Sequence, residues 1–251
     1  MSNLNKVPAV TLGFWLIKIV ATTLGETGGD TLSMTMNFGY ALSSVIFIAL
    51  FAVAVSAQVA VKRYIPLLYW AVIVATTTAG TTMADFADRS LGIGYTGGSA
   101  ILLVSLLAML GLWYKVEGSI AVETVNRPRV EVFYWGAILF SQTLGTALGD
   151  WAADTNGLGY DGGSLLFGGA LALVAAAYAF TRIDRTALFW AAFILTRPLG
   201  ATLGDLLDKP IDHGGFALSR IAASAVLAAL MLAGILFLPQ RAGAHPGAGK
   251  G

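Results

Sequence analysis

The chain has 251 residues, of which 57% are hydrophobic and 12% charged, and its mean hydropathy is +0.75. Soluble domains carry roughly 25% charged residues, so this composition excludes an ordinary soluble domain and indicates an integral membrane protein. The net charge of +1 gives no basis for nucleic-acid binding. The absence of cysteine excludes disulfides, thiolate metal sites and cysteine nucleophiles.

About eight apolar segments are long enough to cross ~30 Å of hydrocarbon, which takes roughly 20 helical residues. In chain order they are residues 9–29, 37–61, 66–86, 97–114, 131–151, 162–181, 186–206 and 215–238. Each is continuously apolar and does not alternate with a period of two, so helices are favoured over a β-barrel. We expect the first segment to be retained, because no small-residue cleavage site follows it. The Gly- and Pro-rich tail, 239–251, is expected to be disordered.

Basic residues gather at one set of segment ends. They are Lys6, Lys62, Arg63, Lys115, Arg127, Arg129, Arg182, Arg185, Arg241 and Lys250. The opposite ends carry most of the acidic residues. By the positive-inside rule the basic ends face the cytoplasm, and an even number of spans then places both termini there.

A fourfold internal repeat is the clearest pattern in the sequence. Its four tryptophans are Trp15, Trp70, Trp135 and Trp190. Ten residues after them come Gly25, Gly80, Gly145 and Gly200, and fifteen residues after them come Asp30, Asp85, Asp150 and Asp205. Small residues recur four positions after each glycine, a spacing that lets helix backbones approach closely. The tryptophan spacing divides the chain into two halves offset by 120 residues: 9–114, with repeats 1 and 2, and 131–238, with repeats 3 and 4.

From Phe14 to Leu238 this organisation resembles a bacterial "membrane-anchored protein" family of four tandem two-helix repeats of unknown function. The resemblance rests on the Trp, Gly and Asp positions above, and it implies a multi-pass protein of the bacterial inner membrane with no established activity. Because each repeat has two spans, all four point the same way. We therefore expect an all-α membrane protein of four parallel helix hairpins, with a pseudo-axis along the membrane normal.

The repeat aspartates are the main candidate site residues. If the first helices of the repeats surround the axis, Asp30, Asp85, Asp150 and Asp205 form an acidic ring. The alternative is ordinary polar capping at water-exposed helix ends, although the helix dipole disfavours negative charge at a C-terminal end by ~0.3–1 kcal/mol. Acidic residues near the membrane usually face a cavity or a partner. Glu26 lies one turn deeper in the first helix and joins this set.

Hard oxygen ligands suit a divalent cation or protons, so this set is a hypothetical metal or ion site. The hydroxyls of Thr27, Thr82 and Thr202 are expected to add neutral ligands. In three of the four repeats a second acidic residue follows the ring aspartate by three or four positions. We assign these residues either to the site or to its vestibule. These second acids are Asp88, Asp154 and Asp208.

Five basic residues break the charge pattern: Lys18, Arg89, Arg197, Lys209 and Arg220. We expect Lys18 to reach the cytoplasmic surface, and Arg89 and Lys209 to pair with the adjacent Asp88 and Asp208. Arg197 and Arg220 are interpreted as counter-charges to nearby acids, or else as gating or anion-binding groups.

We interpret the polar turns and the tryptophans as structural features. Ser99, Asp161 and Ser164 are expected to N-cap the second helices of their repeats. The Gly-Gly pairs before the two serines are expected to adopt positive φ. The four tryptophans are expected to form an interfacial aromatic belt.

The sequence favours a transporter for a small cation. One alternative is a carrier for small organic solutes that uses Arg197; another is a membrane scaffold or sensor without transport. We expect no enzyme activity and no cofactor, because there is no histidine pair for zinc and no nucleophile–base motif. The expected partners are the lipid bilayer and a small cation or solute, and the small-residue faces also allow a homo-oligomer.

Overall fold

The computed structural model describes residues 5–243 and is all-helical over that range. Eight long helices follow one another, two in each repeat. The first helices of the repeats are α1 (Leu12–Asp30), α3 (Pro66–Asp85), α5 (Pro128–Asp150) and α7 (Arg185–Asp208). The second helices are α2 (Gly39–Ala60), α4 (Tyr95–Glu117), α6 (Gly159–Phe180) and α8 (Arg220–Phe237). The expected all-α fold of four helix-hairpin repeats is therefore confirmed.

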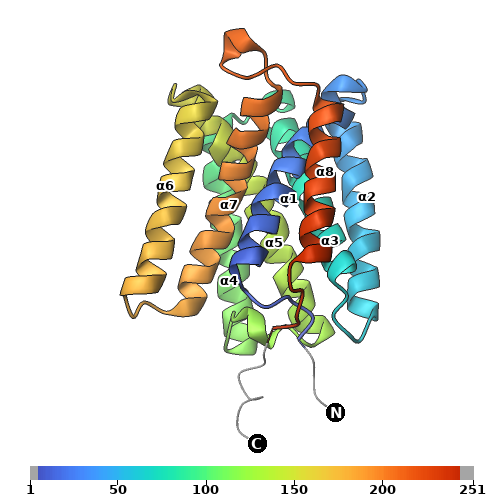
Figure 1. Ribbon diagram of the computed structural model, residues 1–251, viewed down its shortest axis with the longest axis vertical. Coiled ribbons are helices and arrows are strands. Elements are labelled where there is room, and N and C mark those ends of the chain that lie inside the picture. The colour runs from blue at the N-terminus through green and yellow to red at the C-terminus, as the bar shows by residue number, and fades with distance from the viewer. Residues whose placement is uncertain (1–4, 244–251) are drawn as a thin grey trace, which may run out of the picture.

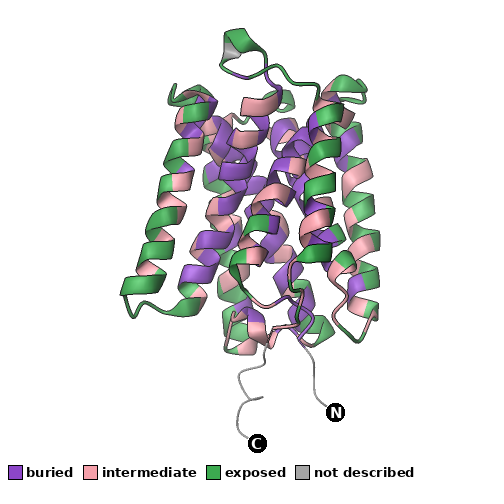
Figure 2. Cartoon of the chain, viewed as in Figure 1, coloured by how far each residue is buried: buried purple, intermediate pink, exposed green. Residues whose placement is uncertain are grey.

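The first helices form a closed inner ring, in which α1 packs on α3, α3 on α5, α5 on α7 and α7 on α1. The second helices of the repeats lie outside this ring, and we call them the outer helices. Figure 2 shows the buried residues (purple) concentrated in the middle of the bundle, whereas the outer helices are largely exposed. All eight helices run along the long axis of the molecule (Figure 1). We call the end where the inner helices begin the basic end, and the end where they finish the acidic end.

Each outer helix covers the inner helix of the following repeat. Thus α2 packs on α3, α4 on α5 and α6 on α7, while α8 returns to pack on α1. Figure 1 shows α8 (red) beside α1 (blue), so the last repeat closes onto the first. The repeats interlock in a cycle, and the chain as a whole approximates fourfold symmetry around the axis of the inner ring.

Six of these helices are long and apolar enough to cross a membrane by length and composition. In the described chain they are α3 with its extension to Ser90, α7 and the four outer helices. The count falls short of the eight expected because glycines, threonines and charged residues lower the mean hydropathy of α1 and α5. Those side chains are buried: Lys18, Glu26 and Asp30 in α1 are each at most 2% exposed.

Glycine permits the close contacts of the inner ring. A Cβ on Gly25 would overlap Thr77, one on Gly80 would lie 2.9 Å from the Gln142 backbone carbon, and one on Gly145 would overlap Arg197. Gly200 meets Thr22 in the same way, which completes the cycle. In each case the glycine ten residues after the tryptophan accommodates the residue seven after the tryptophan of the next repeat. The spacing of small residues therefore has the close-packing role expected from the sequence.

The tryptophans do not form an interfacial belt. Trp70, Trp135 and Trp190 are at most 4% exposed, and they lie inside the basic end of the bundle. The aromatic residue before each tryptophan contacts the tryptophan of the next repeat. These pairs are Phe14–Trp70, Tyr69–Trp135, Tyr134–Trp190 and Phe189–Trp15, with ring centroids 5.5–6.4 Å apart. The expectation of a belt was wrong because three of the four rings are buried inside the bundle, and only Trp15 is partly exposed.

Both ends of the described chain meet over this aromatic layer. The amide of Ala9 donates to Arg241 O, and that of Gly243 donates to Val7 O. Gln240 Oε1 accepts a hydrogen bond from Trp70 Nε1 at 3.1 Å. The start of the tail that we expected to be disordered is therefore paired, and residues 244–251 of that tail lie outside the described residues.

The turns at the acidic end differ from expectation. Positive φ occurs at Gly92, Gly94, Gly157 and Gly159, whereas both Gly-Gly pairs lie inside helices. Since α4 begins at Tyr95 and α6 at Gly159, Ser99, Asp161 and Ser164 lie within helices and do not cap them. Helix α8 begins at Arg220, five residues later than expected, because residues 215–218 fold back along the end of α7 through backbone hydrogen bonds.

Candidate functional site

Polar side chains occupy three successive levels of the inner ring, one helical turn apart. The level seven residues after the tryptophans holds Thr22, Thr77, Gln142 and Arg197. The next holds Glu26, Thr81, Thr146 and Ala201, and the last holds Asp30, Asp85, Asp150 and Asp205. All twelve residues are buried. The interior is thus polar toward the acidic end and aromatic at the basic end.

The four ring aspartates lie where the inner helices finish. After Asp30, Asp85 and Asp150 the chain forms one wider π-helical turn each time: η1 (Thr31–Thr35), η2 (Phe86–Ser90) and η4 (Trp151–Thr155). Such turns are rare and occur often at functional sites. In the fourth repeat α7 stays α-helical to Asp208, so the ring is not fully symmetric.

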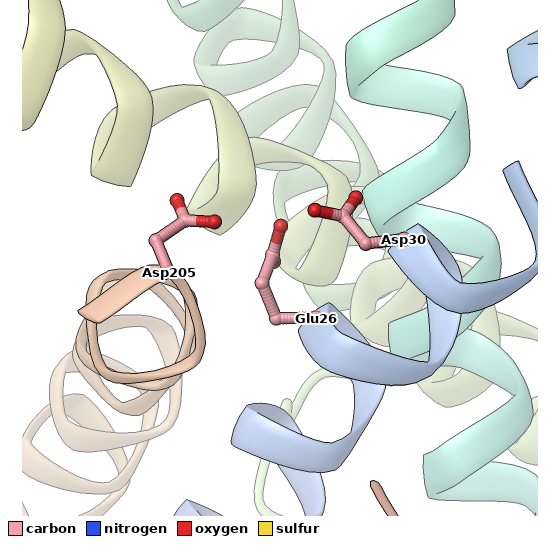
Figure 3. Close-up of side chains that lie close together, drawn as sticks. All are labelled: Glu26, Asp30 and Asp205. Carbon is pink, nitrogen blue, oxygen red and sulfur yellow. The ribbon is translucent and has the colours of Figure 1, made fainter. Parts of the chain in front are cut away.

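Glu26, Asp30 and Asp205 form a compact carboxylate cluster. One oxygen from each lies within 4.8 Å of the others, and all three residues are at most 2% exposed. Figure 3 shows Glu26 and Asp30 of α1 and Asp205 of α7 directed toward a common space. Asp30 Oδ1 accepts no hydrogen bond from any described residue. Three hard oxygen ligands at this spacing have the chemistry of a cation site.

Lys209 holds this cluster together. Its Nζ lies 2.6 Å from Asp30 Oδ2 and 3.0 Å from Asp205 Oδ1. Burial lowers the pKa of Lys209, but the charges of Asp205, Asp30 and Asp208 outweigh burial and raise the pKa overall. The ammonium is therefore retained beside the carboxylates.

The other two ring aspartates share an arginine. Arg89 Nε lies 2.9 Å from Asp85 Oδ1, and Arg89 Nη2 lies 3.5 Å from Asp150 Oδ2. The expected pairing of Arg89 and Lys209 with their sequence neighbours was wrong, because a helical residue faces positions four away and not the adjacent one. The acidic ring is thus divided into two bridged pairs.

Arg197 lies on the axis of the ring. Its Nη2 donates to Glu26 Oε2 at 2.9 Å, to Thr81 Oγ1 at 2.6 Å and to Thr146 Oγ1. One nitrogen of α7 therefore contacts α1, α3 and α5 together. The side chain is 0% exposed and forms an ion pair with Glu26, the contact that its interpretation as a counter-charge requires.

The structure does not bring the three candidate threonines to the carboxylates. Thr82 and Thr202 donate to carbonyl oxygens of their own helices. Thr27 and Thr202 also accept hydrogen bonds from serines of the outer helices, Ser224 and Ser164. The threonines at the axis are instead Thr81 and Thr146, one position earlier in their repeats, and the sequence interpretation missed them.

The second acids occupy different environments. Asp154 is exposed, whereas Asp88 and Asp208 are buried. Asp88 packs against Gly98 near the start of α4. Arg220 Nε lies 3.4 Å from Asp208 Oδ2 and 3.8 Å from Asp30 Oδ2, so Arg220 also borders the carboxylate cluster.

Lys18 does not reach the surface as expected. It is 0% exposed, its Nζ donates to Thr196 Oγ1 at 3.4 Å, and it lies 4.1 Å from the centre of the Phe193 ring. A lysine on the lipid-facing side of a helix extends along that surface until its ammonium reaches water. Lys18 instead projects into the ring, where no such route is open.

Comparison with known proteins identifies the repeat. A family model described as "Repeat of Unknown Function (DUF347)" matches residues 13–64, 68–119, 133–184 and 188–241. Each match covers one inner helix and the outer helix that follows it, so the chain belongs to this family of four tandem repeats, and the resemblance seen in the sequence is confirmed. No curated protein and no solved structure matches the chain.

Proposed function

We propose that this member of the DUF347 repeat family is a membrane transporter that moves a small cation along the axis of its inner ring. The observation that carries the proposal is the buried cluster of Glu26, Asp30 and Asp205, whose oxygens lie within 4.8 Å of one another. Buried carboxylates are costly inside a membrane protein and usually mark an ion or proton path.

In this proposal all eight helices cross the bacterial inner membrane. The inner helices α1 and α5 are too polar to face lipid on every side, but the ring and the outer helices surround their polar faces. The basic end faces the cytoplasm under the positive-inside rule, so both termini are cytoplasmic. The carboxylate cluster then lies nearer the opposite surface.

Lys209 acts as a tethered cation that a transported ion replaces. Its ammonium already occupies the space between Asp30 and Asp205, and it lies one residue beyond the end of α7. When Lys209 swings toward the acidic end, three carboxylates are left to bind the entering cation. Since Arg197 still balances Glu26, the site then carries about two uncompensated negative charges, which suits a divalent ion or two protons.

In the other half of the ring, where Arg89 bridges Asp85 and Asp150, a transported cation cannot replace the basic side chain in the same way. The residue equivalent to Glu26, 120 positions later, is Thr146, so only two carboxylates meet there. Arg89 is always protonated and binds both of them. We assign the Lys209 half to ion binding and the Arg89 half to holding the ring closed.

The test is ion uptake into proteoliposomes containing the full chain. Mn²⁺, Mg²⁺ and Ca²⁺ are offered in turn, with an internal pH dye to report proton movement. The wild type is expected to take up at least one of these ions. Asp205→Asn is expected to reduce that flux more than tenfold, because it removes one of the three ligands. Asp85→Asn, the same change in the other half, is expected to retain most of it.

An exposed acid, Asp161, supplies the surface control as Asp161→Asn. Equal loss in Asp205→Asn and Asp85→Asn would contradict the assignment to one half. No flux of any ion through folded wild-type protein would reject cation transport. It would favour the organic-solute carrier or the scaffold.

A further inference from the structure

A second group of buried polar atoms lies nearer the basic end than the carboxylates do. It is at the level of the residues seven positions after the tryptophans. Thr77, Gln142 and Arg197 are each 0% exposed. Thr77 Oγ1, both amide atoms of Gln142, and Nε and Nη1 of Arg197 have no hydrogen-bond partner among the described residues. Buried polar groups are nearly always paired, so several unpaired ones at one level require an explanation.

Their shared level follows from the packing of the inner ring. Thr77 packs on Gly25, Gln142 on Gly80, and Arg197 on Gly145, at equivalent points of three successive helix contacts. The Arg197 guanidinium is on the axis itself, because its Nη2 contacts the three other inner helices. The unpaired atoms therefore lie at one level of the inner ring, the level of the Arg197 guanidinium.

An uncompensated charge adjoins this level. Lys18 lies one turn nearer the basic end, is 0% exposed, and has as its contacts Thr196 Oγ1 and the face of the Phe193 ring. Among the described residues it forms no ion pair, whereas the charge of Arg197 is balanced by Glu26. A buried ammonium without a counter-ion is strongly unfavourable, so Lys18 carries its proton here only when a negative charge lies beside it.

Hydrogen-bond donors dominate the unpaired atoms. Arg197 offers three N–H groups on Nε and Nη1, Gln142 offers two on its amide, and Lys18 uses one of its three. The Thr77 hydroxyl can also donate. A ligand that satisfies these donors must carry acceptor atoms, and a negatively charged one also balances a protonated Lys18.

We propose that Lys18, Thr77, Gln142 and Arg197 form a binding site for a small anion on the axis, below the carboxylate cluster. A halide, a nitrate or the carboxylate of a short organic acid shares the required chemistry. The aromatic layer between this level and the basic end separates the anion from the cytoplasmic surface. The proposal does not depend on cation transport, since none of these four residues belongs to the carboxylate cluster.

The experiment measures the melting temperature (Tm) of the purified full chain in detergent. Sodium chloride, nitrate, formate and acetate are titrated at constant sodium concentration and ionic strength, with sodium gluconate as the bulky reference salt. At least one small anion is expected to raise Tm saturably. A response to chloride or nitrate indicates an inorganic anion, and a response to formate or acetate alone indicates an organic carboxylate.

Variants then locate the site. Lys18→Met is expected to abolish the response, whereas Lys62→Met, at an exposed position, is expected to keep it. If Lys18→Met does not fold, Gln142→Glu provides a second test, because its carboxylate takes the place of the anion. This variant is expected to have a higher Tm without added anion and no further response.

Asp205→Asn is expected to retain the anion response, so a failure of the cation site does not affect this test. The absence of a saturable Tm rise for all four anions would overturn the proposal. So would an unchanged anion response in both Lys18→Met and Gln142→Glu.

Discussion

Arg89 and Lys209 occupy equivalent positions in the two halves of the chain, 120 residues apart. Each lies four residues after a ring aspartate and joins it to the aspartate of the next inner helix: Arg89 joins Asp85 to Asp150, and Lys209 joins Asp205 to Asp30. The two bridges convert an approximate fourfold ring into a twofold one. They also differ chemically, because a lysine is a flexible point charge and an arginine a rigid fork.

The first prediction concerns this difference. Lys209→Met leaves Asp30 and Asp205 without their main counter-charge, and breaking such a buried pair costs about 3–5 kcal/mol. We expect a lower Tm in a chelator-containing buffer and a recovery of stability when a divalent cation replaces the ammonium. Thermal unfolding with and without Mn²⁺, Mg²⁺ and Ca²⁺ measures both effects.

Arg89→Met is the matched control. It also lowers Tm, but the two carboxylates of that half are expected to give a much smaller recovery with cations. An equal recovery in both variants would show that Glu26 does not distinguish the halves.

The spacing of Trp, Gly and Asp predicted the ring and its contacts because these residues repeat with one period. A contact made once between neighbouring repeats then recurs around the axis. Gly145 against Arg197 and Gly25 against Thr77 are two instances of the same contact. The placement of Asp30 beside Asp205 follows from this repetition, whereas only the structure shows that Glu26 has an oxygen within 4.8 Å of both.

Other features were not predictable, because a continuously apolar helix does not reveal which of its faces meets protein. Lys18 was expected at the surface and Trp70 at the lipid interface, yet both point into the bundle. The choice between Thr82 and Thr81 as the axial hydroxyl depends on a rotation of about 100° per residue. Without a polar–apolar pattern around the helix, the sequence does not fix that rotation.

The second prediction tests close packing. Gly145→Ala places a Cβ against the Cβ and Cγ atoms of Arg197, which are too near the backbone to move aside easily. We expect a loss of about 1–3 kcal/mol from overpacking. Gly111→Ala in α4 is the control, since an added Cβ there meets nothing within 4 Å. It should be neutral or stabilising, because alanine favours helix over glycine. Denaturant titration of both variants in detergent provides the comparison, and equal stability would contradict the ring packing.

The third prediction concerns the aromatic layer at the basic end. The hydroxyls of Tyr69 and Tyr134 lie 2.7 Å apart and both residues are 0% exposed. Tyr134→Phe leaves the Tyr69 hydroxyl buried without this partner, which costs about 1–3 kcal/mol.

The double variant Tyr69→Phe/Tyr134→Phe is expected to be close to wild type in Tm. It removes both hydroxyls and gives these two repeats the phenylalanine that Phe14 and Phe189 already supply in the others. Comparing the Tm of the double variant with that of Tyr134→Phe shows whether the unpaired Tyr69 hydroxyl causes the loss of stability. If the two losses simply add, the hydroxyl pair is not the interaction that holds this layer.

The fourth prediction concerns the ion pair on the axis. Arg197→Met removes the nitrogen that contacts three inner helices and leaves Glu26 buried beside Thr81 and Thr146. Because the carboxylate then lacks its counter-charge, we expect a loss of about 3–5 kcal/mol. Glu26→Gln alone leaves the guanidinium uncompensated and is expected to destabilise for the same reason.

In the double variant Arg197→Met/Glu26→Gln both charges disappear together, so most of the lost stability is expected to return. A double-mutant cycle in detergent, with unfolding free energies for all four proteins, gives the coupling between the two residues. A strongly favourable coupling supports Arg197 as the counter-charge of the carboxylate cluster. If the coupling is near zero, Arg197 stabilises the ring chiefly through its threonine contacts, and the charge of Glu26 must be balanced by a bound cation instead.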